Sequence, residues 1–158
     1  MYLCGKFHLN KRIMNREIEF RGFDGREWRY GDLEYNRKDD VAQIHTYKED
    51  GSYNKQYLVD PYTVGEFTGM RDRHGKKVFE GDIVRKRDLT FETELVGVVV
   101  YNSATGCFRI HSERNGTTTR SGFEMSDVYD DGKCTVPVRY EYEVIGNVYD
   151  NKDLLMEK

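Results

Sequence analysis

The stretch TGMRDRHGKKVFEGDIV, Thr68 to Val84, decides how this chain is interpreted. Its glycines and lysines raise the question of a phosphate-binding loop, G-x-x-x-x-G-K-[ST], which leaves a strand and opens a helix. Here five residues separate Gly69 from Gly75 instead of four, and Lys77 stands where a Ser or Thr hydroxyl would hold magnesium. The residues that follow, Val78 to Val84, have the pattern strand, turn, strand. The stretch therefore predicts a hairpin with a charged tip, in which Gly75 accepts positive φ without steric cost.

Four further dipeptides carry the same turn signal: Asp24-Gly25, Asp50-Gly51, Asn115-Gly116 and Asp131-Gly132. Such pairs are preferred at the centre of two-residue hairpins, where both residues need positive φ. REIEFRGF and REWRYGDL surround the first pair, and VAQIHTYKE and SYNKQYLV surround the second. Apolar and polar residues alternate in these flanks, which predicts half-buried strands paired as hairpins.

The second half of the chain has its own succession of short strands. ELVGVVVYN, Glu94 to Asn102, is a continuous apolar run and predicts a central strand buried on both faces. CFRIHSE follows after a turn, and YEVIGNVYD, Tyr142 to Asp150, predicts a last strand with a bulge or kink at Gly146. This order suits either a small SH3-like barrel or an open curved sheet, and the sequence does not choose between them.

Helix signals are few and short. Asp60-Pro61 predicts one helical turn, with Asp60 as the N-cap and Pro61 at the first helical position. EMSDVYD, residues 124–130, and NKDLLMEK, residues 151–158, predict two more short pieces. The predicted fold class is mainly β, a β-rich α+β fold of antiparallel hairpins with a few short helices.

Composition narrows the class of protein. The 158 residues fit one domain, and an aromatic content of 13%, including 12 Tyr, argues against disorder. The net charge of −3 gives no global attraction to nucleic acid, although Arg71 to Asp88 hold seven Lys or Arg against four Asp or Glu. The three cysteines are far apart and no apolar run reaches the roughly 18 residues of a membrane helix. We expect a cytoplasmic protein without a zinc site, a disulfide framework or a membrane span.

Candidate catalytic groups do not form a constellation. His45, His74 and His111 have no ligand-spaced partners, and we expect His74 to be a solvated turn residue. Cys107 follows Gly106, but His111 lies about 13 Å farther along an extended strand, too far for direct proton transfer. We therefore expect Cys107 to be a buried or half-buried structural cysteine.

Three carboxylates, Asp72, Glu80 and Asp82, surround the predicted hairpin. Catalytic carboxylate pairs need burial or close juxtaposition that separates their pKa values. Lys and Arg flank these three, so we expect surface ion pairs and turn hydrogen bonds, with Asp82 accepting from backbone N–H groups. No enzyme, cofactor, metal or small-molecule substrate is expected.

Four segments together resemble the YopX-like family of phage and prophage proteins: MNREIEFRGFDG (Met14 to Gly25), VDPYTVGEFTGMRDRHGKKVFEGDIV (Val59 to Val84), VVYNSATGCFRI (Val99 to Ile110) and YEVIGNVYDNKDLL (Tyr142 to Leu155). The resemblance implies a largely β fold in a bacterial host and carries over no catalytic residues. Residues 1–13 fall outside it, so we expect either a natural start at Met14 or a disordered extension. Residues 14–158 form a single domain in this interpretation, with N-terminal hairpins in 14–60 and a barrel-like part in 61–158.

The leading functional expectation is a non-catalytic accessory protein that binds a host or phage protein or associates with itself. Tyr-rich strands and exposed sheet edges suit such contacts. The alternative is a small barrel that binds nucleic acid by stacking bases on aromatics beside a basic strand. The candidate surface for a partner or nucleic acid comprises Arg71, Arg73, Lys76, Lys77, Arg85, Lys86, Arg87, Tyr101 and Phe108.

Overall fold

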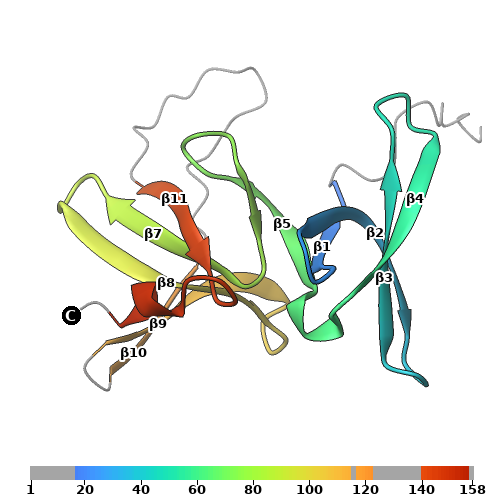
Figure 1. Ribbon diagram of the computed structural model, residues 1–158. Helices are drawn as coiled ribbons and strands as arrows, with labels where there is room; N and C mark the ends of the chain where they lie inside the picture. Colours follow the sequence, from blue (N-terminus) through green and yellow to red (C-terminus); the bar gives the residue numbers. More distant parts are fainter. Residues whose placement is uncertain (1–16, 115–116, 123–139, 157–158) are drawn as a thin grey trace, which may run out of the picture.

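Two antiparallel sheets make up the described part of the chain (Figure 1). The computed structural model describes residues 17–114, 117–122 and 140–156. Within these ranges the helical elements are two 3-10 helices, η1 (Pro61–Thr63) and η2 (Lys152–Leu155). None of the helices in these ranges is long and apolar enough to cross a membrane. The mainly β class predicted from the sequence is confirmed.

The first sheet has six strands in the order β4-β3-β2-β1-β5-β6. Their bounds are β1 (Phe20–Phe23), β2 (Trp28–Asn36), β3 (Val41–Tyr47), β4 (Tyr53–Val59), β5 (Gly65–Arg71) and β6 (Lys77–Phe79). The sequence placed the division between hairpins and the barrel-like part at residue 60, but β5 and β6 extend this first sheet beyond it. The reason is that β5 pairs with β1, through Phe20 opposite Glu66.

The second sheet has five strands in the order β10-β9-β8-β7-β11. Their bounds are β7 (Asp82–Asp88), β8 (Thr93–Asn102), β9 (Cys107–Arg114), β10 (Thr117–Gly122) and β11 (Tyr140–Asn147). Among the described strands, no pairing joins β10 to β11. The sequence was compatible with either a small SH3-like barrel or an open curved sheet. The described pairings correspond to the open sheet.

The two hairpins predicted around Asp-Gly pairs are present. β1 and β2 flank Asp24-Gly25, and β3 and β4 flank Asp50-Gly51. Both connections are longer than the predicted two-residue turns, because the pairings end at Phe23 opposite Trp28 and at Tyr47 opposite Tyr53. The turns predicted at Asn115-Gly116 and Asp131-Gly132, and the helix predicted at 124–130, lie outside the described residues.

Local signals for the ends of elements are also confirmed. The Asp60 side chain accepts from the backbone N of Tyr62 at the start of η1, with Pro61 in the first helical position. The pairing of β11 with β7 shifts register between Val144 and Gly146, which is the predicted bulge. η2 begins after Asn151, although that side chain makes no capping hydrogen bond.

Each sheet has its own hydrophobic cluster. The first contains Ala42, Ile44 and Val59, and the second contains Val78, Val84, Val99, Ile110 and Tyr142. Val78 belongs to β6 of the first sheet but packs in the core of the second. The β5–β6 hairpin therefore joins the two sheets through its apolar side chains.

The prediction that β8 is buried on both faces is wrong. Val99 is fully buried, whereas its neighbours Val98 and Val100 are only partly buried. Successive side chains of a strand point to opposite faces, and the core lies on one face only. β8 is central in its sheet, but its valine run covers an outer face that the described residues leave partly open.

Candidate functional site

The stretch from Thr68 to Val84 forms the β5–β6 hairpin, a tight turn at Gly81 and the first part of β7. Gly75 has φ +81° and Gly81 has φ +82°, conformations that residues with a Cβ rarely adopt. The predicted hairpin with its charged tip is confirmed.

Asp72 fixes the tip of this hairpin against the second sheet. Its Oδ1 accepts from the backbone N of His74 at 2.8 Å and of Lys76 at 2.9 Å, and its Oδ2 accepts from the N of Val144 in β11 at 3.1 Å. Burial opposes ionisation of this carboxylate, but the three backbone donors outweigh burial and lower the pKa of Asp72. The role of Asp72 is therefore to join β11 to the hairpin tip.

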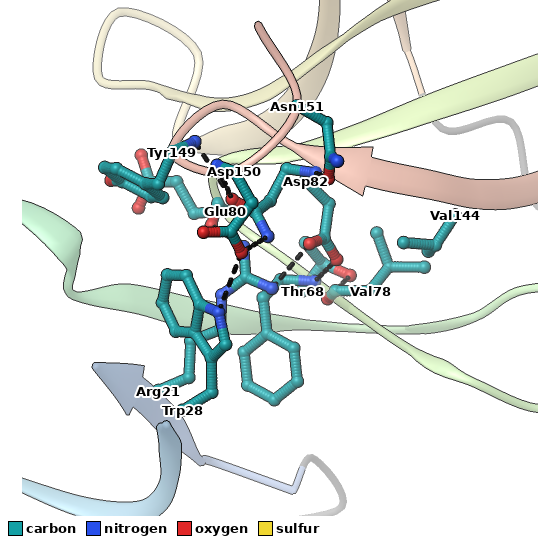
Figure 2. A network of polar contacts seen from close by, with 12 residues as sticks. Arg21, Trp28, Thr68, Val78, Glu80, Asp82, Val144, Tyr149, Asp150 and Asn151 are labelled. Carbon is teal, nitrogen blue, oxygen red and sulfur yellow. Dashed lines mark hydrogen bonds and ion pairs between the residues drawn. The ribbon is translucent and has the colours of Figure 1, made fainter. Parts of the chain in front are cut away.

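Asp82 and Arg21 form a buried ion pair between the two sheets (Figure 2). Arg21 Nη1 lies 2.5 Å from Asp82 Oδ1, and Arg21 Nη2 donates to the carbonyl of Glu80 at 3.0 Å. Asp82 Oδ2 accepts from Phe79 N at 2.8 Å, which confirms its predicted turn hydrogen bond. Burial raises the pKa of Asp82, and the Arg21 guanidinium opposes that shift.

Aromatic rings enclose this ion pair. The Arg21 guanidinium lies 4.7 Å from the ring centroid of Trp28 and 5.2 Å from that of Phe79. Trp28 contacts Tyr149, and its indole Nε1 donates to Asp150 at 3.1 Å, as Figure 2 shows. The segment after β11 is thereby tied to the first sheet. We call Arg21, Trp28, Phe79, Asp82 and Tyr149 the inter-sheet junction.

The candidate catalytic groups remain separated in the fold. His45, His74 and His111 each lie near a different glutamate, and His74 is exposed in its turn as predicted. In residues 17–114, 117–122 and 140–156 no group of three or more His, Cys, Asp or Glu side chains is placed to hold a metal ion. Cys107 is exposed, so the prediction of a buried structural cysteine is wrong. It lies at the start of β9, beside the β8–β9 turn, where no core covers it.

Most cations of the predicted partner surface are neutralised by acids, of which Glu94 is seven residues away in sequence and the others are more than 50 residues away. The ion pairs are Arg71 with Glu17, Arg73 with Glu141, Lys77 with Glu17 and Glu19, Arg85 with Glu143, and Arg87 with Glu94. Lys86 is buried, with its Nζ 3.9 Å from the ring centroid of Tyr140 and 2.8 Å from Ser121 Oγ. Lys76 is exposed and lines a cavity of about 230 Å³ with Arg21, Tyr30 and Lys77. The local surplus of positive charge is thus largely balanced.

The two aromatics of that surface lie on the other side of the sheet from its arginines. Arg85 pairs with Val96, and Tyr101 pairs with Phe108. Side chains alternate along β8, so Val96 and Tyr101 point to opposite faces. Tyr101 and Phe108 contact each other, with ring centroids 5.4 Å apart. The structure therefore does not bring these aromatics together with Arg85 and Arg87.

Two surface features could not be located from the sequence. One is a groove of about 380 Å³ over β8, β9 and β10, lined by Arg109, His111 and Arg120 among others. The other is the outer edge of β4, which has no partner strand among the described residues. Arg109 and His111 were visible as alternating residues of one strand, but the position of Arg120 depends on the pairing of β10 with β9.

Comparison with protein families gives a match over most of the chain. The curated proteins contain no significant match to the chain. The protein-family comparison matches residues 19–156 to the family described as YopX protein, which includes the hairpin, the inter-sheet junction and both sheets. The chain therefore belongs to the YopX family.

Proposed function

We propose that this chain is a non-catalytic binding module, a phage or prophage accessory protein of the bacterial cytoplasm that binds another protein or a second copy of itself. One observation carries the proposal. β4 is a seven-residue edge strand of the first sheet, and two of its large apolar side chains are exposed: Tyr53 at 53% and Leu58 at 67%.

An edge strand presents backbone N–H and C=O groups that another strand can pair with. Proteins that avoid such pairing protect their edges with prolines, bulges or several charges. β4 contains no proline and one charged residue, Lys55. Its one irregularity is a register shift near Tyr53, at the hairpin end. The edge therefore suits addition of a strand from a partner.

Aromatic side chains lie beside this edge. Tyr53 contacts the rings of Tyr47 and His45, with centroids 6.4 Å and 6.1 Å apart. Tyr47 is itself exposed. Tyrosine is enriched in protein interfaces because its ring contributes apolar area while its hydroxyl finds a polar partner. Strand addition at β4 would cover these rings as well as the backbone.

The experiment compares tagged wild-type chain with Leu58→Asp and Tyr53→Asp, two exposed positions whose change leaves the core intact. Leu89→Asp is the matched control, because Leu89 is also exposed but follows β7 in the second sheet. Each protein is retained from a bacterial lysate, with and without nuclease, and sized by chromatography with light scattering. We expect a nuclease-resistant partner or an oligomer that both β4 variants lose and Leu89→Asp keeps. A monomer without partners, or equal loss in the control, contradicts the proposal.

Nucleic-acid binding through the basic strand β7 gains less support from the geometry, because Arg85 and Arg87 are ion-paired and Lys86 is buried. Such binding would weaken steeply with salt, since each phosphate contact releases counterions. A salt titration of any retained nucleic acid separates this function from protein binding.

A further inference from the structure

A groove of about 380 Å³ lies over the outer face of the second sheet. Its walls come from the end of β8, the β8–β9 turn, β9 and β10. The lining residues are Val100, Tyr101, Asn102, Ser103, Ala104, Arg109, His111 and Arg120. None of these eight residues is acidic, although the whole chain carries a net negative charge.

The strand register gathers three basic side chains in this groove. Arg109 and His111 are two residues apart on β9 and so point to the same face. Arg120 of β10 lies directly opposite His111, and Gly122 lies opposite Arg109. Arg120 and Arg109 are thus diagonal neighbours on adjacent strands. Like charges so close on one sheet face are unfavourable unless an anion lies between them.

These arginines differ from those of β7 in their partners. Arg85 and Arg87 are ion-paired with glutamates. Within the described part of the chain, Arg109 donates through Nε to the Thr105 hydroxyl, at 3.4 Å, and contacts the Cys107 thiol, and it has no ion pair. Within the described ranges Arg120 has no ion pair or side-chain hydrogen bond to a protein acceptor. Glu113 contributes a carboxylate that contacts the cluster, 3.3 Å from His111 Nε2.

We propose that this groove binds a phosphate group between Arg109 and Arg120. The planar guanidinium fork matches the oxygens of phosphate or carboxylate bidentately. Two guanidiniums that approach from adjacent strands can each take a different pair of oxygens on one phosphate, whereas a carboxylate has only two oxygens in one plane. Asn102, Ser103 and His111 line the same groove and add polar groups for the remaining oxygens.

The phosphate has two sources. A free phosphate ion offers each guanidinium its own pair of oxygens, whereas the phosphodiester of a single-stranded nucleic acid has two non-bridging oxygens and offers each guanidinium one of them. Aromatic stacking is not part of the proposal: Tyr101 lines the groove, but its ring contacts that of Phe108, with centroids 5.4 Å apart. The site is independent of the β4 edge, which belongs to the other sheet. An experiment that rejects the phosphate site therefore does not affect the proposal for the β4 edge, and the reverse also holds.

The experiment titrates the full chain with inorganic phosphate by calorimetry and with a labelled short oligo-dT strand by fluorescence anisotropy, at low salt. The test variants are Arg109→Gln and Arg120→Gln. Arg26→Gln is the matched control, since Arg26 is an exposed arginine in the β1–β2 turn, in the other sheet. Thermal melting of each variant shows that the fold is kept, and Arg120→Lys tests whether charge alone restores binding.

We expect each test variant to weaken binding about tenfold, as loss of a charge-assisted hydrogen bond does, and Arg26→Gln to change it less than twofold. Binding of both probes, or of phosphate alone, supports a site for a free ion. Binding of oligo-dT alone supports a nucleic-acid backbone, with a salt slope that falls by about 0.7 in Arg120→Gln. The proposal is overturned if neither probe binds, or if Arg26→Gln weakens binding as much as the groove variants do.

Discussion

Arg21 of β1 and Asp82 of β7 form an ion pair across the two sheets, with exposed fractions of 5% and 1%. The partners are 61 residues apart in sequence. The sequence predicted only a turn at Glu80-Gly81-Asp82. The contact between Arg21 and Asp82 makes this turn the point where the first sheet is attached to the second. Arg21 Nε has no hydrogen-bond partner among the described residues, so the pair is stabilised by charge, by the Glu80 carbonyl and by aromatic rings.

We predict that Asp82→Asn destabilises the protein by about 3 to 5 kcal/mol, because it leaves a buried guanidinium without a counter-charge. Removing both charges in Arg21→Met/Asp82→Asn should recover part of that loss, since no uncompensated ion remains. Urea unfolding of the two single variants and the double variant measures the coupling. If the free-energy changes of the two single substitutions add up to that of the double substitution, the two residues do not act as a pair.

Asp72→Asn should loosen the contact between the hairpin tip and β11. The amide keeps an acceptor for His74 and Lys76 but turns an NH₂ donor toward the backbone N–H of Val144. An unsatisfied buried N–H costs about 1 to 3 kcal/mol. Amide hydrogen exchange should accelerate at Val144, while Ile44, in the core of the first sheet, serves as the reference amide. Unchanged protection at Val144 would contradict this role.

Asp24 should give stability a pH dependence in acid. Hydrogen bonds from the backbone N of Glu27, from Arg29 and from the N of Arg26 lower the pKa of Asp24 to about 2. The ordinary value in an unfolded chain is about 3.9. Because the folded value is the lower one, the stabilisation is complete above pH about 4 to 5 and is lost as the pH falls toward about 2.

The measurement that tests Asp24 is urea unfolding of wild type and Asp24→Asn at a series of pH values from about 7 down to about 2. The two proteins should differ at neutral pH and converge in acid. Asp153→Asn, which removes an exposed carboxylate of η2, controls for the change in net charge. A difference that stays constant down to pH 2 would assign the effect to something other than ionisation of Asp24.

The exposed thiol of Cys107 should be more reactive than an ordinary cysteine. A hydrogen bond with the Thr105 hydroxyl and the neighbouring Arg109 lower the pKa of Cys107. Thr105→Val should raise this pKa and slow alkylation near pH 8, because the thiolate is the reactive form. Thr105→Ser keeps the hydroxyl and should react like wild type. The test measures alkylation rates as a function of pH in a protein whose Cys4 and Cys134 are replaced by Ser. Equal rates for Thr105→Val and Thr105→Ser would exclude the hydrogen bond as the cause of the lowered pKa.

Local signals in the sequence were enough for most strands of the described chain and for the positions of its turns, although β10 was not predicted and the Asp-Gly connections are longer than two residues. The Asp-Gly pairs, the cap at Asp60 and the bulge at Gly146 each depend on the backbone preferences of a few adjacent residues. Such preferences act within a turn, so they can be recognised without knowing the fold. The family was also visible at this level, because its four segments are the turns and strands themselves.

The sequence could not show which strand faces would be buried or which charged side chains would form ion pairs. The burial of β8 on one face, the exposure of Cys107 and the ion pairs that neutralise Arg85 and Arg87 all depend on packing. The same is true of the groove, where Arg120 reaches Arg109 only through the pairing of β10 with β9.

Side-chain alternation and the φ angles that glycine allows were enough to predict the β class and the hairpins. The spacing from Gly69 to Gly75 and the lysine at position 77 excluded a phosphate-loop motif. Packing was needed to bring Arg21 to Asp82 and to gather Arg109, Arg120 and His111 in one groove. The physical reason is that an ion pair is set by distance in space, and distance between residues far apart in the chain is set only when the sheets pack.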